Sequence, residues 1–338
     1  MTRLSLLAAL LLAPGLLAGC AASGGHDAAA TPAPAATAPL ATSMTTAAGQ
    51  AWAIIAMGGS AANEDLFWEL ITRPAGSTRW TLVTPPGVAD NGGLVAAGSS
   101  GPLTVGFEPS QDLTFSPLAS TGDDGSTWGA GLLNAPLASV PDAVAADGAG
   151  LLALLHDGAI DQVTAGQPAA GQAPAVPGNW TTLAAPGAIA ASPAGRRCQV
   201  TGLVAVAYTP SGTPLAAASC ARAGSTGIFA RVAGTWQASG PAAPGGQPLR
   251  VIRLTQTPAG DTALLQAGTS GAASLSAAWR ELPAPPRGTA ALAASPDGAY
   301  DALVVSAATL TIDQVAAGGS AWRAEQVIKV PIQYGSSS

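Results

Sequence analysis

The sequence predicts an all-β protein whose main domain is a β-propeller of six blades. Turns of the form Ser/Thr-Pro-x-Gly recur between short apolar runs, at 192–195, 209–212, 257–260 and 295–298. No apolar stripe of helical period and length follows the first twenty residues. Tryptophans recur at intervals of about 43 to 56 residues, the length of a propeller blade: Trp80, Trp128, Trp180, Trp236, Trp279 and Trp322. A pair of β-sandwiches is the alternative, but it requires no tryptophan at this spacing.

The tryptophan spacing also predicts the number of blades. Trp80 and Trp322 bound five repeats, and the residues outside them add up to about one more blade. We therefore expect six blades, one of them assembled from both ends of the chain, which would leave no exposed sheet edge. Seven blades would follow if Trp52 or Trp68 marked another repeat. The run Ile-Asp-Gln-Val occurs at both 160–163 and 312–315 and is a further echo of the repeat.

The N-terminus has the pattern of an export signal over residues 1–19. Arg3 precedes an apolar run over residues 4–17, which is shorter than the roughly 20 residues that span a bilayer. The segment closes with Leu17-Ala18-Gly19-Cys20, which resembles the bacterial lipobox. The resemblance implies cleavage before Cys20 and diacylation of its thiol. Ordinary secretion with an incidental cysteine is the alternative.

The residues after Cys20 lack the large side chains that build a core. Residues 20–49 are rich in Ala, Pro and Thr, so we expect a lipidated, disordered tether, followed by the propeller domain at 50–338. Two acyl chains anchor a protein stably to a bilayer. We therefore expect a location at the cell membrane, lipid-anchored on its extracytoplasmic face.

Charge limits the classes of partner. Only 9% of the residues are charged, Lys329 is the single lysine, and the formal net charge is −6. A nucleic-acid-binding protein would need basic patches, so we expect no nucleic acid partner. We also expect no cofactor and a monomer.

A calcium loop at Asp123-Asp124-Gly125 is disfavoured because no carboxylate follows in residues 126–135.

Two cysteines remain after Cys20 is assigned to lipid. Cys198 and Cys220 flank two apolar runs joined by the turn at 209–212, so a hairpin would bring them to opposite positions. In an oxidising compartment such a pair is most simply a disulfide, with two free thiols as the alternative. Two cysteines are too few for a metal site, and we expect no metal.

One repeat matches a known motif. Thr121, Asp123, Gly125, Thr127 and Trp128 fit the Asp-box, Ser/Thr-x-Asp-x-Gly-x-Thr-Trp, at its defined positions. The chain thus resembles the Asp-box (BNR-repeat) propellers of the sialidase-like superfamily. The resemblance implies a structural hairpin turn between the third and fourth strands of a blade. The other repeats would be degenerate copies that keep the blade tryptophans Trp80, Trp180, Trp236, Trp279 and Trp322.

The residues disfavour the enzymatic activity of that superfamily. A sialidase binds its substrate carboxylate with an arginine trio, and the nearest match to the first arginine, Arg73-Pro74, lacks the family pattern. His156-Asp157-Gly158 has the form of a hairpin turn. We therefore expect a non-catalytic propeller, with no catalytic residues, that binds an envelope protein or a glycan. A degenerate or unrecognised glycoside hydrolase is the alternative.

The lipid anchor is tested by Cys20→Ala. Because the lipid would be the whole membrane attachment, we expect the variant to leave the membrane pellet for the soluble fraction, as measured by fractionation and immunoblotting. Ser23→Ala serves as a control and should stay in the pellet. Retention of the Cys20→Ala variant at the wild-type level would contradict the anchor.

Overall fold

A computed structural model describes the chain from residue 40 to residue 329, with gaps. The described ranges are 40–47, 50–60, 63–83, 93–97, 103–107, 118–121, 129–130, 141–147, 150–164, 180–209, 211–225, 227–240, 249–257, 260–267, 272–276, 280–294, 298–306 and 309–329. Of their secondary structure nearly all is strand, and the helices among them are too short to cross a membrane.

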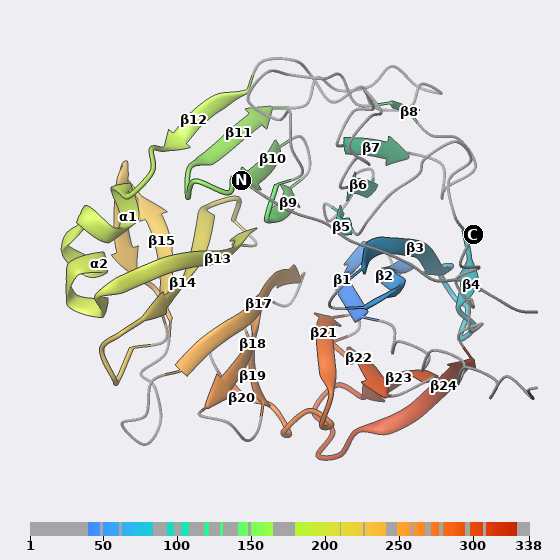
Figure 1. The fold of residues 1–338 in the computed structure, drawn as a ribbon. Coiled ribbons are helices and arrows are strands. Elements are labelled where there is room, and N and C mark those ends of the chain that lie inside the picture. The colour runs from blue at the N-terminus through green and yellow to red at the C-terminus, as the bar shows by residue number, and fades with distance from the viewer. Residues whose placement is uncertain are drawn as a thin grey trace, which may run out of the picture. The chain divides into compact units, whose positions relative to one another are not determined.

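The described strands form six antiparallel sheets of four strands each, and every sheet uses four consecutive strands (Figure 1). In chain order the strands are β1 (Leu40–Ala47), β2 (Gln50–Ser60), β3 (Asn63–Arg73) and β4 (Thr81–Leu82); β5 (Gly93–Ala97), β6 (Leu103–Phe107), β7 (Leu118–Thr121) and β8 (Gly129–Ala130); β9 (Ala143–Asp147), β10 (Gly150–Leu154), β11 (Ile160–Thr164) and β12 (Thr181–Ala184); β13 (Val200–Tyr208), β14 (Pro214–Cys220), β15 (Ile228–Val232) and β16 (Thr235–Ala238); β17 (Leu249–Thr257), β18 (Gly260–Ala267), β19 (Ala272–Ser276) and β20 (Arg280–Glu281); β21 (Thr289–Ala294), β22 (Tyr300–Ser306), β23 (Thr309–Val315) and β24 (Arg323–Lys329).

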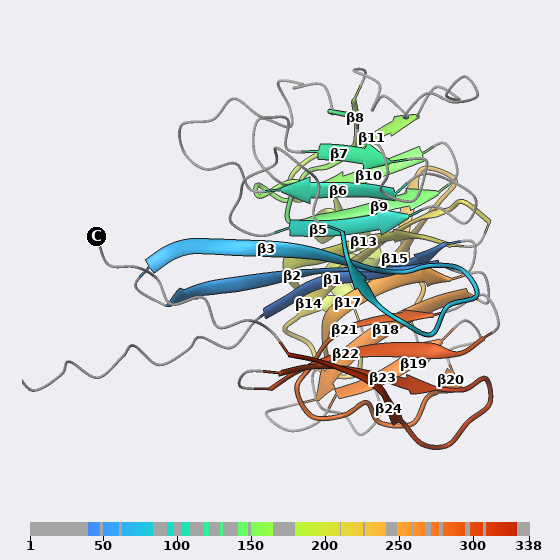
Figure 2. The same cartoon turned by 90° about the vertical axis from the view of Figure 1, so that its right-hand side faces the viewer.

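The first strands of the sheets contact one another in a closed cycle. Within residues 36–338, β1 contacts β5, β5 contacts β9, and the series continues through β13, β17 and β21 back to β1. Seen from the side, β5, β6 and β7 lie next to one another in order (Figure 2). Consecutive four-stranded sheets that contact cyclically through their first strands are the architecture of a β-propeller, so the prediction of an all-β propeller is confirmed.

The described blade tryptophans mark the same place in four of the sheets. Trp80, Trp180 and Trp322 directly precede the fourth strands β4, β12 and β24, and Trp236 lies inside the fourth strand β16. The Ile-Asp-Gln-Val echo also falls on equivalent strands, since β11 and β23 are both third strands. The period read from the sequence is therefore the period of the sheets.

The prediction that one blade is assembled from both ends of the chain is wrong. Among the described strands, no sheet combines both ends of the chain, because β1 to β4 and β21 to β24 each form a sheet by themselves. The reason is that β1 begins at Leu40, inside the segment predicted to be a tether over residues 20–49. Small residues such as Ala and Thr can form an innermost strand because its hydrogen bonds come from β2 rather than from large side chains.

The core lies between sheets, which explains why the strands do not alternate between apolar and polar residues. In β14, the consecutive residues Leu215, Ala216, Ala217 and Ala218 are all fully buried. Their side chains point alternately to the two faces of the sheet, so both faces are covered. Alanine suits this position because small side chains allow neighbouring sheets to approach closely.

Two short helices, α1 (Ala188–Ala191) and α2 (Pro193–Cys198), connect β12 to β13. The sequence predicted a tight turn at 192–195, and this prediction is wrong. Instead, Ser192 is the N-cap of α2, where its Oγ accepts a hydrogen bond from the Gly195 N–H at 2.9 Å, and Pro193 occupies the first turn. By contrast, the turn at 209–212 is confirmed: Gly212 has a φ of 77° and its N–H donates to the Thr209 carbonyl at 2.8 Å.

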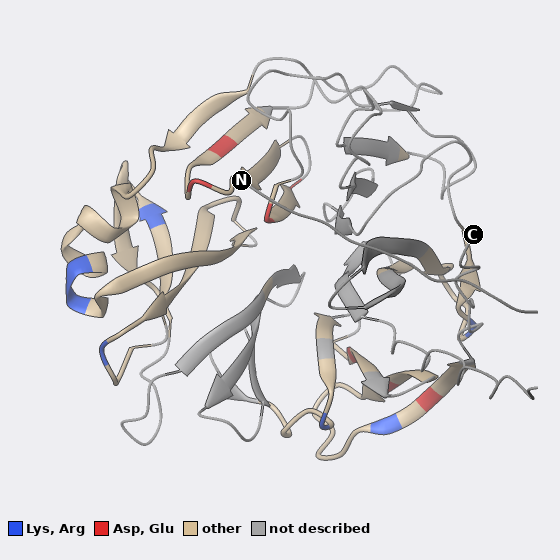
Figure 3. Ribbon diagram, viewed as in Figure 1, with Lys and Arg blue, Asp and Glu red and all other residues tan. Residues whose placement is uncertain are grey.

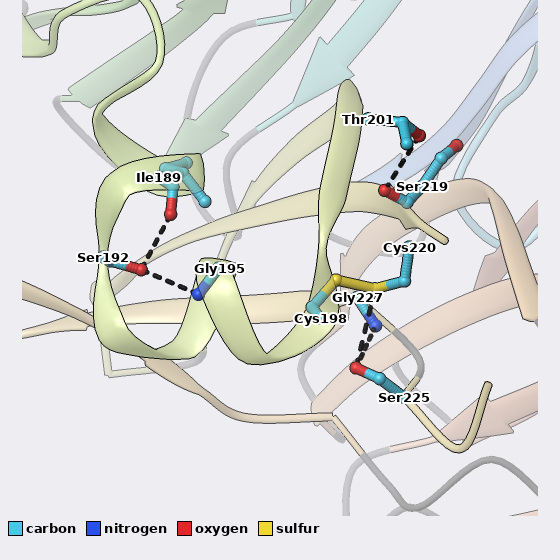
Figure 4. Close-up of a disulfide and its surroundings, with 9 residues drawn as sticks. All are labelled: Ile189, Ser192, Gly195, Cys198, Thr201, Ser219, Cys220, Ser225 and Gly227. Atoms are coloured by element: carbon cyan, nitrogen blue, oxygen red, sulfur yellow. Dashed lines mark hydrogen bonds between the residues drawn. A yellow bond between two sulfur atoms is a disulfide. The ribbon is translucent and has the colours of Figure 1, made fainter. Parts of the chain in front are cut away.

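The predicted disulfide between Cys198 and Cys220 is confirmed, with the two Cα atoms 5.1 Å apart (Figure 4). It joins the last residue of α2 to the last residue of β14, rather than two strands as expected. The Ala221 N–H donates to the Gln199 carbonyl at 3.0 Å, so backbone hydrogen bonds continue beyond the bridge. The disulfide thus fixes the helical connection to the end of the sheet.

Removal of this disulfide should destabilise the protein. The bridge spans 22 residues, and cross-links that close loops of about this length stabilise proteins by about 3 kcal/mol. We expect the double variant Cys198→Ser/Cys220→Ser to lose about this much free energy of unfolding in urea titrations followed by tryptophan fluorescence. A transition midpoint equal to that of the wild type would contradict the expectation.

Candidate functional site

The charged residues Arg73, Asp301 and Glu325 come together between the first and last sheets, and we call them the closure cluster. Arg73 is the last residue of β3, while Asp301 and Glu325 lie on β22 and β24. The Arg73 Nη2 atom lies 2.9 Å from Asp301 Oδ2, and Nη1 lies 3.4 Å from Glu325 Oε2. The Asp301 side chain is completely buried and that of Arg73 is 8% exposed. One guanidinium therefore binds two carboxylates from the opposite end of the chain.

Neutral polar groups surround this cluster. Gln314 Nε2 donates to Asp301 Oδ1 at 2.9 Å, and the Arg73 guanidinium lies over the Trp80 ring at 5.6 Å from its centroid. Gln326 binds the backbone of Trp80 on both sides: its Oε1 accepts from the Trp80 N–H at 2.9 Å, and its Nε2 donates to the Trp80 carbonyl at 3.4 Å. These contacts connect β3 and the start of β4 with β22, β23 and β24.

The arrangement favours a structural role for the closure cluster. A glycosidase acts with two carboxylates that flank the bond to be cleaved, so both must reach the substrate. Asp301 is wholly inaccessible, and Arg73 binds both acids. Burial raises the pKa of Glu325, against the lowering effect of Arg73, and the nearby Asp301 adds to the rise. The cluster therefore holds two sheets together through one buried ion pair and one weaker, partly exposed one.

A second polar pair, Asp147 and Tyr208, lies at the ends of the neighbouring first strands β9 and β13. Burial raises the pKa of Tyr208 well above its ordinary value, and the negative charge of Asp147 raises it further. A tyrosine nucleophile or base needs the opposite shift, toward the phenolate. The raised pKa therefore favours the protonated phenol of Tyr208 over the phenolate.

The described part of the chain holds only some of the predicted site residues. Thr121 ends β7 and is buried, and β8 begins at Gly129, so the Asp-box lies between a third and a fourth strand in the chain. Its remaining residues lie outside the described ranges, and its role stays a prediction: Asp123, Gly125, Thr127 and Trp128. The same holds for Trp279 and for the lipobox residues Leu17, Ala18, Gly19 and Cys20.

The blade tryptophans contribute to contacts between sheets. Trp80 and Trp236 are buried. The Trp322 Nε1–H donates to the Pro283 carbonyl at 2.9 Å, which connects the last sheet to the segment after β20. Trp52, considered above as a possible marker of an extra blade, is instead a core residue of β2 with 2% exposure.

The His156-Asp157-Gly158 motif is a turn rather than a site. At 155–158 the Gly158 N–H donates to the Leu155 carbonyl, and Asp157 Oδ1 accepts from the Ala159 N–H, which confirms the predicted hairpin turn. The His156 side chain is 94% exposed.

Sequence reasoning missed the closure cluster, because Arg73 is 228 positions from Asp301 and 252 positions from Glu325, and no local motif marks these residues.

No family model and no curated protein matches this chain. Among solved structures, TolB from Acinetobacter baumannii is 13% identical with a TM-score of 0.49, over 81% of this chain and 62% of that one. The periplasmic gluconolactonase PpgL from Pseudomonas aeruginosa is 14% identical with a TM-score of 0.44, over 86% of each chain. The GH74 xyloglucanase from Xanthomonas campestris is 14% identical with a TM-score of 0.45, over 86% of this chain and 46% of that chain. At this level of similarity the fold assignment depends on the sheet topology described above.

The two acids of the closure cluster should respond differently to neutralisation. Asp301→Asn removes the buried partner of Arg73, so we expect a loss of about 3 kcal/mol or more in the free energy of unfolding. Glu325→Gln imitates the protonated form that the fold prefers, since the pKa of Glu325 is raised.

The sign of the pH dependence follows from that direction. Below the ordinary carboxyl pKa of about 4.3, Glu325 is protonated in both states, and the wild type and Glu325→Gln should differ least. As the pH rises toward 7, ionisation of Glu325 destabilises the folded wild type. The stability of Glu325→Gln relative to the wild type should therefore increase with pH. Melting temperatures from pH 3.5 to 7.5 measure this difference, and a gap that shrinks with rising pH would contradict the assignment.

Proposed function

We propose that this protein is a six-bladed, lipid-anchored propeller on the extracytoplasmic face of the membrane, where it binds an envelope protein or a glycan without catalysing a reaction. The blade number is supported by the six described sheets and the cyclic contacts of their first strands. The anchor is supported by the lipobox-like residues Leu17 to Cys20. The degenerate Asp-box repeats would place structural turns at the outer edges of the blades.

The observation that carries the location is the disulfide between Cys198 and Cys220. Structural disulfides form in oxidising compartments and are rare in the cytosol. The bridge and the export signal are independent features of the chain, one in the fold and the other in the first twenty residues. Both favour a protein that works outside the cytoplasm.

Binding is favoured over catalysis by the states of the polar groups. The guanidinium of Arg73 is bound by two carboxylates, and Tyr208 is held in its protonated form. Propellers place loops around a central channel, and such loops bind ligands without a diagnostic motif.

A glycoside hydrolase is the second candidate, and the closure cluster is the observation that favours it. Asp301 and Glu325 are two carboxylates held close to one arginine. Because Asp301 is fully buried, a substrate would reach it only if the first and last sheets separated. The binding function therefore explains the burial better.

The two candidates are separated by measurements on the purified full chain. We expect no turnover of chromogenic glycosides above the background of heat-unfolded protein, and saturable binding to one fraction of an envelope extract. Protease treatment of the extract abolishes the binding if the ligand is a protein, and periodate treatment abolishes it if the ligand is a glycan. Turnover that Glu325→Gln abolishes, with an unchanged melting temperature, would contradict the proposal and favour the hydrolase.

A further inference from the structure

One third of the chain carries only positive charge. Residues 162–260 contain no Asp or Glu, although the whole chain has 19 acidic residues and a net charge of −6. The same segment contains the arginines Arg196, Arg197, Arg222, Arg231, Arg250 and Arg253. Figure 3 shows blue but no red positions on α2 and the sheet β13 to β16, whereas acidic positions lie on other sheets. The charge asymmetry is therefore spatial as well as sequential.

Three exposed arginines lie around the disulfide: Arg196 and Arg197 in the last turn of α2, and Arg222 two residues after the end of β14. We call them the arginine patch. The Arg222 N–H donates to the Cys198 carbonyl at 3.1 Å, which brings the two segments within backbone contact. Among the described residues, none of the three arginines forms an ion pair with a carboxylate. The patch thus carries uncompensated positive charge on the end of the sheet where β13 begins.

The backbone on which the patch stands is unusually well fixed. The disulfide joins Cys198, next to Arg197, to Cys220, two residues before Arg222. Ser192 caps α2 from the other side, and the Arg196 guanidinium donates to the Ala191 carbonyl at the end of α1. A surface that is rigid before binding loses less conformational entropy when a partner docks.

From these observations we infer that the arginine patch binds an acidic segment of a protein partner through its carboxylates. The guanidinium group matches a carboxylate with two parallel N–H donors, which gives orientation as well as attraction. Electrostatic complementarity also steers encounter, and here it would select one side of an otherwise acidic protein. The inference rests on the proposed binding function and names the chemistry of its partner.

A protein segment fits the patch better than the two other anionic surfaces of an envelope. Basic clusters that bind anionic lipids contain about four to eight Lys and Arg residues, which is more than the three arginines of this patch. A sugar chain would be expected to stack on aromatic rings, but Tyr208, Phe229 and Trp236 of this sheet are all buried in its core. Three arginines on a rigid turn suit a short run of Asp or Glu side chains.

The test is fluorescence anisotropy with fluorescein-labelled decaglutamate and the full chain in non-ionic detergent, with decaglutamine as the neutral probe. We expect decaglutamate to bind, to weaken with added salt, and to weaken by about tenfold or more in Arg197→Gln/Arg222→Gln. The matched control is Arg79→Gln/Arg287→Gln, which removes the same charge from two exposed arginines elsewhere. The control should bind within about twofold of the wild type.

Each other outcome would overturn the inference. Absence of decaglutamate binding, or an equal loss in both double variants, would show that the patch is not a specific site. Tighter binding of the same arginines to phosphatidylglycerol vesicles or to polygalacturonate would assign the patch to lipid or glycan instead. Since this assay needs neither the lipid anchor nor an envelope extract, failure of the anchor or of the binding function leaves its result readable.

Discussion

The closure of the ring between its first and last sheets is the constraint on which the rest of the structure depends. Each sheet is built from four consecutive strands, so no strand is shared across the junction between β1–β4 and β21–β24. Side-chain contacts must therefore hold the first and last sheets together, as a shared strand does in other rings. Here Arg73 reaches Asp301 and Glu325, and Gln326 holds the backbone of Trp80. The same two sheets also share a buried apolar cluster, which includes Ile71, Leu303 and Leu310.

This mode of closure explains why the protein buries a charge, although desolvation of a charge is energetically unfavourable. A buried ion pair often contributes little net stability compared with an apolar replacement, but it is costly to break once formed. Its value here lies in specificity, since the arginine at the end of β3 pairs with two acids of the last sheet. Elsewhere in the described part of the chain, buried apolar clusters lie between sheets, and the Trp322 Nε1–H donates to the Pro283 carbonyl. Among the described residues, the buried ion pair thus lies at the junction that no shared strand closes.

The sequence predicts the repeat well and the junction poorly. Tryptophan spacing located the fourth strands because a large indole recurs wherever a blade must cover its neighbour, and the cysteine pair located the disulfide. The first strand at 40–47 escaped prediction because its Ala and Thr residues resemble a tether, and the capped helix α2 resembled a turn because Ser-Pro-x-Gly fits both. Arg73, Asp301 and Glu325 escaped because only the closed ring brings them together. The arginine patch was visible as Arg196-Arg197, but its third member is added by the disulfide.

The most direct test of side-chain closure is a double-mutant cycle on Arg73 and Asp301, read as free energies of unfolding. Arg73→Met and Asp301→Leu should each destabilise the protein strongly, because each leaves a charge buried without its partner. The double variant, which replaces the pair by apolar side chains, should recover most of the loss, with a coupling energy of about 2 kcal/mol or more. Effects that simply add, within about 0.5 kcal/mol, would show that the two residues act independently and that the ring closes by apolar contact alone.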